Sequence, residues 1–409
     1  MPRLVPSHLF LAAMVLLSSA VGAQAIVYTV TNHQAVGATL DLNPANVYTH
    51  KLDFPGDGNS TAINGVSFTT APAGTFPSYS LTMANPSNFS SGSSNAIIDF
   101  IHNGSQPAGA VETLTLNGLT PGQSYDLRLY YRNFGVRPNN VVINTGSAPV
   151  FTVLDQATAS DENYHSIKYK AEATSITLTL AQQQFNASWH NYALTNEDIT
   201  GKAPQVALIG GLFPTGVGAN GAPLANGAAD IHFNFAGGPQ ASLNGALATV
   251  QANNGAWAAN DGQSKWIGVT ASGGDNVASG IYQYTINFEI PAGADPKTAT
   301  IGGNWLADND GTGTRILLNG IDTLVSNIAP FNAPLPGTAF TIVNGQGGSA
   351  FVSGVNTLTF FVNNPGGANP HGLRVTNLFG SVVFVPEPSS VVMLLMAGVA
   401  TLRRGKRRN

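Results

Sequence analysis

Charged side chains are scarce in this chain, and their scarcity constrains the fold more than any other feature. Lys, Arg, Asp and Glu make up 9% of the 409 residues, whereas about 25% is usual in a globular domain. Long solvent-exposed helices need Glu, Lys and Arg for pairs along their polar faces, so few can form here. The 46 Gly and 24 Pro residues instead supply turns, and 43% hydrophobic residues can bury a core. We therefore expect an all-β protein.

Charge and cysteine content also exclude several functions. Between Ile26 and Val385 the chain keeps 11 of its 17 basic residues and 20 of its 21 acidic residues, a net charge of −9. Such a body repels nucleic acid and anionic lipid, and it is compatible with neutral glycans or divalent cations. Cysteine is absent, which excludes disulfides, thiolate metal sites and cysteine nucleophiles.

Residues 1–25 read as a secretory signal peptide. Arg3 supplies the positive start, residues 9–17 form an apolar stretch, and residues 21–23 (VGA) provide a small-residue cleavage site. The apolar stretch is shorter than the ~20 residues that a membrane-spanning helix needs. We expect this segment to direct export.

Residues 385–409 combine three features: a Pro-Glu-Pro triplet, a short apolar run and a basic end. The residues concerned are Pro386, Glu387, Pro388, the run 391–402, and a basic cluster that begins with Arg403 and Arg404. A basic cluster directly after an apolar run is typical of a stop-transfer segment with a cytoplasmic end. We expect a short transmembrane helix here, too short on length alone for lasting anchorage.

This order of features resembles the PEP-CTERM sorting signal of Gram-negative bacteria. The resemblance implies that an exosortase-type membrane enzyme recognises the tail and that the precursor is transiently inserted in the inner membrane. It also implies a final location at the cell surface or in the extracellular matrix. An ordinary tail anchor is the alternative, and the sequence leaves open whether the tail is removed.

Residues 26–197 are expected to form a first β-sandwich domain. In 125–131 (YDLRLYY), Asp126 and Arg128 alternate with apolar residues, which predicts a half-buried strand. Similar strand segments are expected at 112–116, 166–169 and 175–180. The absence of a sustained 3.6-residue period favours a sandwich over a helical domain.

A linker is expected at 198–204 (DITGKAP), followed by a second β domain at 205–384. Its first part, 203–262, is rich in Gly, Ala and Asn and is expected to be mostly loop. Strand segments then follow at 281–290, 299–306, 315–318, 339–343, 357–362 and 373–384. Asn319-Gly320 predicts a tight hairpin, and the regular spacing favours a sandwich or jelly roll.

An ordered series of motifs in this second domain includes SKWIG at 264–268, GIY at 280–282, WLADN at 305–309 and ILLNG at 316–320. The series is similar to the galactose-binding-like jelly rolls of secreted bacterial proteins. The resemblance implies a jelly-roll fold for 205–384 and, more loosely, for the first domain. That fold carries many functions, glycan binding among them.

Two groups of residues are candidates for binding. Asp308 and Asp310 lie in DNDGTG, which has the alternating oxygen ligands of a calcium loop, but Asn319 replaces the Glu that an EF-hand requires. A looser calcium site and a polar turn are the two interpretations. Aromatic rings stack on the apolar faces of sugars, and Trp257, in the loop-like segment 253–257, is the candidate glycan contact. Trp266 and Trp305 lie within expected strands and favour a core position.

The motifs of metal and serine hydrolases, HExxH, GxSxG and SxxK, do not occur in the sequence. We therefore expect a non-enzymatic protein with a structural or adhesive role at the cell surface or in an exopolysaccharide matrix. The alternative is a lectin-like carbohydrate-binding protein, assisted by calcium. A third hypothesis is a glycan-active enzyme whose two carboxylates come from distant parts of the chain.

Overall fold

A computed structural model describes residues 26–34, 40–54, 62–90, 98–146, 148–157, 163–201 and 206–384. In these ranges the regular structure consists of β-strands and three short 3-10 turns, so the expected all-β class is confirmed. Both terminal signals, 1–25 and 385–409, lie outside the described residues, as does the expected C-terminal helix. Within the described ranges, no helix is long and apolar enough to cross a membrane.

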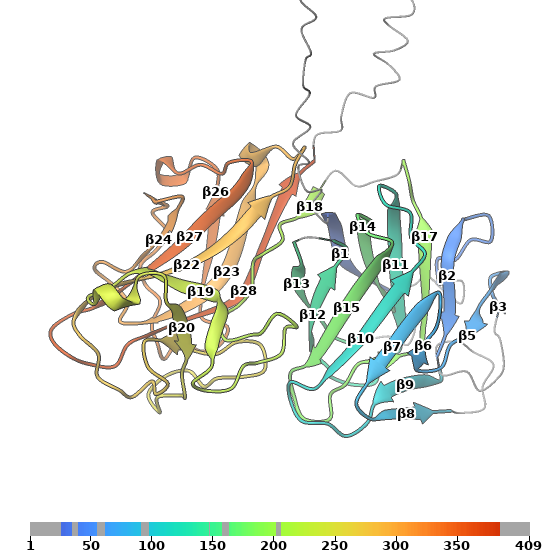
Figure 1. The fold of residues 1–409 in the computed structure, drawn as a ribbon, viewed down its shortest axis with the longest axis horizontal. Helices are drawn as coiled ribbons and strands as arrows, with labels where there is room; N and C mark the ends of the chain where they lie inside the picture. The colour runs from blue at the N-terminus through green and yellow to red at the C-terminus, as the bar shows by residue number, and fades with distance from the viewer. Residues whose placement is uncertain are drawn as a thin grey trace, which may run out of the picture.

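The N-terminal half, residues 26–201, contains two facing six-stranded sheets (Figure 1). The first has the order β1 (Ile26–Gln34), β14 (Asn163–Lys170), β11 (Ser124–Tyr131), β17 (Ala193–Asp198), β2 (Tyr48–Asp53), β5 (Thr69–Thr70). The second has the order β13 (Val150–Leu154), β12 (Asn139–Asn144), β15 (Ser175–Gln182), β10 (Val111–Asn117), β7 (Tyr79–Met83), β6 (Gly74–Thr75). A smaller sheet joins β16 (His190–Asn191), β9 (Phe100–Asn103) and β8 (Pro86–Phe89), and β3 (Ala62–Ile63) pairs with β4 (Val66–Ser67).

The sandwich core of this half lies between the two large sheets. Leu127 of β11 and Ile167 of β14 belong to the same buried cluster as Leu114 of β10 and Leu178 of β15. Alternation along each strand directs these side chains inward. The expected sandwich arrangement therefore holds in this half.

Strand β11 differs from the half-buried strand that its alternation predicts, because both of its faces are covered. Its polar face is covered by part of the segment 40–68, where Leu42 and Phe68 pack in a cluster with Tyr130. Arg128 on the same face donates from Nη1 to the main-chain oxygen of Asp41 at 2.9 Å. Sequence alternation identifies the strand but does not show that a distant segment covers its second face.

The C-terminal half, residues 206–384, is built on one long sheet that curls into two layers. Its path is β25 (Ile321–Asp322), β24 (Arg315–Leu318), β27 (Gly354–Asn364), β22 (Gly280–Ile290), β19 (Ala229–Gly237), β20 (Leu247–Val250), β21 (Ile267–Gly268), β28 (Gly372–Val383), β23 (Thr300–Asp308), β26 (Thr338–Val343). Strand β18 (Val206–Leu208) pairs with β28 outside this path. The curl encloses the core.

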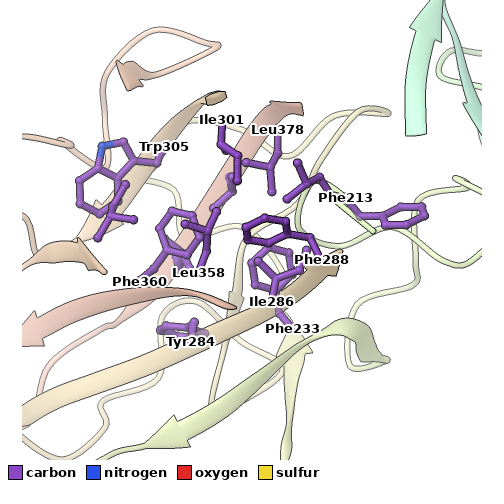
Figure 2. Close-up of a cluster of buried hydrophobic side chains, with 14 of the residues drawn as sticks. Phe213, Phe233, Tyr284, Ile286, Phe288, Ile301, Trp305, Leu358, Phe360 and Leu378 are labelled. Carbon is purple, nitrogen blue, oxygen red and sulfur yellow. The ribbon is translucent and has the colours of Figure 1, made fainter. Parts of the chain in front are cut away.

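Figure 2 shows this core between the two layers. Phe288 and Phe360 come from β22 and β27, whereas Ile301 and Trp305 come from β23. The cluster also includes Tyr28 and Val142 of the N-terminal half. The two halves therefore share buried apolar surface, although no strand pairing between described residues joins them.

Most expected strands lie within two or three residues of the observed bounds. The Asn319-Gly320 turn is also confirmed, since Leu318 pairs with Ile321 and both turn residues have positive φ, as this hairpin turn requires. Most described residues of 203–262 are loop, as expected, but the composition did not indicate β19, a nine-residue strand. Its Phe233 and Phe235 are buried while Ile231 is exposed, so the alternation is present within a Gly- and Ala-rich context that obscures it.

Candidate functional site

A groove of about 520 Å³, lined by polar and apolar residues, lies where the two halves meet. The N-terminal half contributes Ala108, and the C-terminal half contributes 223–226, Asn253, 259–262 and Lys265. All of these residues lie in loops. The groove therefore depends on contacts that hold the loops in place.

One residue of the N-terminal half supports the two loops from the C-terminal half. Asn140 of β12 donates from Nδ2 to the carbonyl oxygens of Gly221, at 2.7 Å, and Gly262, at 2.8 Å. Its own Oδ1 accepts from Nε2 of Gln183 at 2.9 Å, which fixes the amide orientation. Asn140 is fully buried, so breaking either bond would leave a buried polar group unpaired.

Gly262 permits the closest approach of the two halves. A Cβ at this position would lie 2.0 Å from the main-chain oxygen of Gln183, which is a backbone atom and cannot rotate away. Any side chain at 262 would therefore push the loop off the N-terminal half. The close contact between Gly262 and Gln183 therefore supports both the groove and the packing of the two halves.

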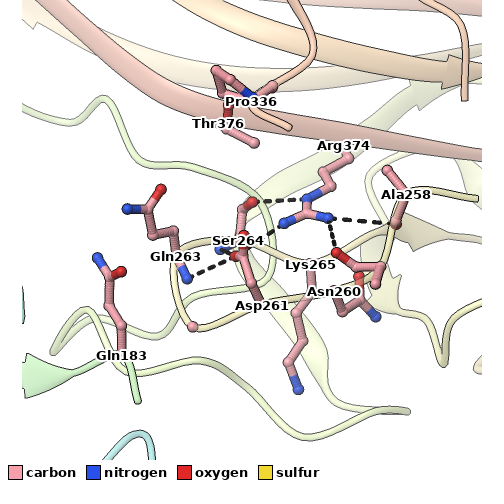
Figure 3. A network of polar contacts seen from close by, with 12 residues as sticks. Gln183, Ala258, Asn260, Asp261, Gln263, Ser264, Lys265, Pro336, Arg374 and Thr376 are labelled. Atoms are coloured by element: carbon pink, nitrogen blue, oxygen red, sulfur yellow. Dashed lines mark hydrogen bonds and ion pairs between the residues drawn. The ribbon is translucent and has the colours of Figure 1, made fainter. Parts of the chain in front are cut away.

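Beneath the groove, the guanidinium of Arg374 organises the loop 258–264 (Figure 3). Its Nε donates to Oγ of Ser264 at 2.8 Å, and Nη1 donates to the main-chain oxygen of Ala259. Nη2 forms an ion pair with Oδ1 of Asp261 at 2.9 Å. The same Oδ1 accepts from the main-chain N–H of Ser264 at 3.0 Å, closing the turn.

The electrostatics of this pair are asymmetric. The side chain of Arg374 is completely buried, whereas that of Asp261 is 38% exposed at the groove. Burial lowers the pKa of Arg374, and Asp261 opposes that shift in part. The arginine is therefore a buried cation whose one carboxylate partner remains accessible to solvent and ligand.

Lys265 continues this loop but extends its side chain away from Arg374 (Figure 3). Its main-chain N–H donates to the oxygen of Thr215 at 2.9 Å, and its carbonyl accepts from Oγ1 of Thr215 at 2.6 Å. Gly216 makes room for it, since a Cβ there would lie 2.6 Å from Cβ of Lys265. Burial lowers the pKa of the Lys265 ammonium, and no charged side chain among the described residues pairs with it.

Trp257, the expected glycan contact, is placed in the interior. Its indole is 5% exposed, lies 4.4 Å from the ring of Trp266 between centroids, and donates from Nε1 to Oδ2 of Asp308 at 2.8 Å. Trp189, Trp266 and Trp305 are buried as well. In this arrangement the face of Trp257 is not presented for stacking.

The two expected calcium ligands, Asp308 and Asp310, each accept a hydrogen bond from another part of the protein. Asp308 accepts from Trp257, and Oδ2 of Asp310 accepts from the main-chain N–H of Ala329 at 3.1 Å. Burial raises the pKa of Asp308, and the charge of Asp310 adds to this. In the described ranges, no cluster of three or more His, Asp or Glu could hold a metal ion. Calcium at Asp308 and Asp310 stays a prediction.

Exposed aromatic side chains occur on the small sheet of the N-terminal half and on the loop that follows β11. Phe89 and Phe134 are 44% and 48% exposed. Both contact Phe100, whose ring stacks at 3.9 Å on the ring of His190. This surface is a second place where a sugar ring could stack, and none of its residues lines the groove.

Sequence reasoning missed the groove residues, most of which lie in the stretch 203–262 assigned to loop, whereas Ala108 and Lys265 lie outside it. The one available signal was the density of Asn, Asp and Gly around Trp257 in 253–262 (NNGAWAANDG). The residues of the expected sorting signal, Pro386, Glu387, Pro388, Arg403 and Arg404, lie outside the described residues.

No protein-family model matches the chain, and neither does any curated protein. One similar solved structure is the ANXUR2 extracellular domain from Arabidopsis thaliana, with 10% identity, coverage of 75% of this chain and 90% of that chain, and a TM-score of 0.24. Another is the CBM22-1-CBM22-2 tandem domain from Paenibacillus barcinonensis Xyn10C, with 10% identity, coverage of 84% and 98%, and a TM-score of 0.26. The plant Receptor-like Kinase FER has 10% identity, coverage of 83% and 96%, and a TM-score of 0.28. At these TM-scores the similarities carry no argument for fold or function.

Proposed function

We propose that the chain is an exported protein that binds polysaccharide through the groove and thereby has an adhesive role at the cell surface or in the extracellular matrix. The observation that carries this proposal is the lining of the groove, which combines Asn226, Asn253, Asp261 and Lys265. Sugar hydroxyls require such donors and acceptors at fixed positions. The hydrogen bonds of Asn140 and Arg374 hold the main chain at Gly221, Gly262 and Ala259, in the loops that carry part of this lining.

Export and sorting belong to the same proposal. The signal-peptide pattern of 1–25 and the PEP-CTERM-like pattern of 385–409 support processing by an exosortase-type enzyme after transient insertion in the inner membrane. Both halves are proposed to be galactose-binding-like jelly rolls, which the curled sandwich of 206–384 and the two facing sheets of 26–201 support.

Binding without catalysis agrees best with the chemistry of the groove. Glycoside hydrolysis generally needs two carboxyl groups on opposite sides of the scissile bond. Among the described lining residues Asp261 is the single acid, and it is already engaged by Arg374. A glycan-active enzyme therefore has less support than a binding protein.

The test is a polysaccharide-binding screen with the purified chain, in calcium and again in EDTA. We expect a bound polysaccharide whose affinity falls at least tenfold when Asn226 and Asn253 are both replaced by Ala, because hydroxyl partners are lost. Thermal unfolding of this double variant should be unchanged, since both side chains lie in exposed loop positions.

Phe134→Ala is the matched control because it removes an exposed aromatic ring outside the groove. Loss of binding in this variant, with full binding by the Asn variant, would place the site on the small sheet and contradict the groove. Loss of binding in EDTA would support calcium at Asp308 and Asp310. Failure to bind any polysaccharide in either condition would contradict the proposed function.

A further inference from the structure

Lys265 is the one cation of the groove lining, and it has no anionic partner among the described residues. The single acid of the lining, Asp261, is held by Arg374 at 2.9 Å. The negative charge of Asp261 is therefore balanced by Arg374, whereas no charged side chain among the described residues balances the ammonium of Lys265. The local charge of the groove is positive in a chain whose body carries −9.

The environment of Lys265 favours an incoming anion. The side chain is partly buried and burial lowers its pKa, which means that desolvation disfavours the charged form. An anionic group placed against the ammonium would recover that lost solvation as an ion pair. A neutral hydroxyl would recover less.

The base of the lysine side chain is also fixed before a ligand arrives. Two hydrogen bonds to Thr215 hold its main chain, and the close contact with Gly216 limits its position further. Preorganisation of this kind reduces the entropy cost of binding. The Lys265 side chain thus starts from a defined place along the groove.

From these observations we infer that the groove selects anionic polysaccharides, with Lys265 pairing with a carboxylate or sulfate group and Asn226 and Asn253 contacting hydroxyls. The inference deepens the proposed function and rests on it. The acidic body opposes a polyanion at long range, but at physiological salt the Debye length is about 8 Å. Distant acids are therefore screened more strongly than the contact with Lys265.

The experiment measures the affinity of the full chain for matched polymer pairs at 0.15 M salt. Polygalacturonate and its methyl ester differ in the carboxylate, and dextran sulfate and dextran differ in the sulfate. We expect the native chain to prefer one anionic polymer about fivefold to tenfold over its neutral partner, as one partly buried ion pair allows. The pair that shows the preference identifies the anion.

Variants separate charge from structure. Lys265→Gln should abolish the preference, because affinity for the anionic polymer should fall more than affinity for the neutral one, whereas Lys265→Arg should retain it. Lys297→Gln, at an exposed position outside the groove, is the matched control and should behave as the native chain.

Equal affinity of the native chain for both members of each pair would overturn the inference while leaving the proposed function intact. An equal decrease in affinity for both polymers of a pair in Lys265→Gln would overturn it as well. In that case the lysine would stabilise the loop and would not distinguish charged from neutral polymers. Failure of the native chain to bind any of the four polymers would contradict both the inference and this site as a polysaccharide groove.

Discussion

Each half of the molecule has an arginine with little or no solvent exposure, Arg128 at 14% and Arg374 at 0%, and the two are balanced in different ways. Arg128 on β11 forms ion pairs with Asp126 at 3.0 Å and Glu197 at 3.3 Å, and these carboxylates are only 3% and 5% exposed. Arg374 has one carboxylate partner, Asp261, which is 38% exposed. Its remaining contacts are neutral oxygens of the loop 258–264.

The difference appears in the protonation equilibria. Burial acts to lower the pKa of Arg128, but the charges of Asp126 and Glu197, with contributions from neighbouring tyrosines, outweigh it and raise the pKa. For Arg374 burial prevails and the pKa is lowered. Arg128, which pairs with two buried carboxylates, stabilises the sheet. Arg374, whose one carboxylate partner is accessible, can instead hold a surface loop in a binding conformation.

The largest expected effect is that of Arg128→Met. Because two buried carboxylates would lose their cation, the free energy of unfolding should fall by about 3–5 kcal/mol. Urea denaturation monitored by tryptophan fluorescence measures this change. Adding Asp126→Asn and Glu197→Gln to the variant should restore much of the loss. If Arg128→Met alone lowers the free energy of unfolding by less than about 1 kcal/mol, the two carboxylates are accessible to solvent and not buried.

Arg374→Met should have a smaller effect on stability and a larger effect on binding. Asp261 can become hydrated when the guanidinium is removed, so we expect a loss of about 1.5–3 kcal/mol from the charged hydrogen bonds. Polysaccharide binding should disappear because the loop 258–264 loses its organising contacts. Urea denaturation and the binding assay are run on the same preparation. Unchanged binding would contradict the assigned role of Arg374.

The smallest expected effect is that of Asp322→Asn, which removes a pair whose members are both exposed. Nε of Arg315 and Oδ2 of Asp322 are 3.8 Å apart, with side chains 42% and 40% exposed. The asparagine keeps Oδ1 as the acceptor for the main-chain N–H of Leu324. We expect the free energy of unfolding to change by less than about 0.5 kcal/mol. A larger change would break the ranking of the three arginines by burial of their partners.

Local patterns were sufficient to predict much of the fold. Alternation located β11, and the Asn319-Gly320 pair located a hairpin, because both signals depend on neighbouring residues alone. The strand context of Trp266 and Trp305 likewise predicted their burial. In each case the predictive signal spans only a few positions along the chain, although the packing that it predicts involves distant residues.

The site could not be predicted in the same way, because long-range contacts create it. Asn140 bonds to Gly262 across 122 residues, and Arg374 bonds to Ser264 across 110. Trp257 has the local context of an exposed loop, yet Asp308, 51 residues later, accepts its indole N–H. No periodicity or short motif encodes such pairings.

The position of Asn140 has a thermodynamic consequence. Because this residue of one half supports the two loops that the other half contributes to the groove, the groove in its described form exists only while the halves are docked. Ligand binding and docking are then linked equilibria, and each must favour the other by the same free energy. If the groove binds saccharide as proposed, the bound ligand stabilises the docked arrangement of the halves, and any condition that separates them weakens its binding.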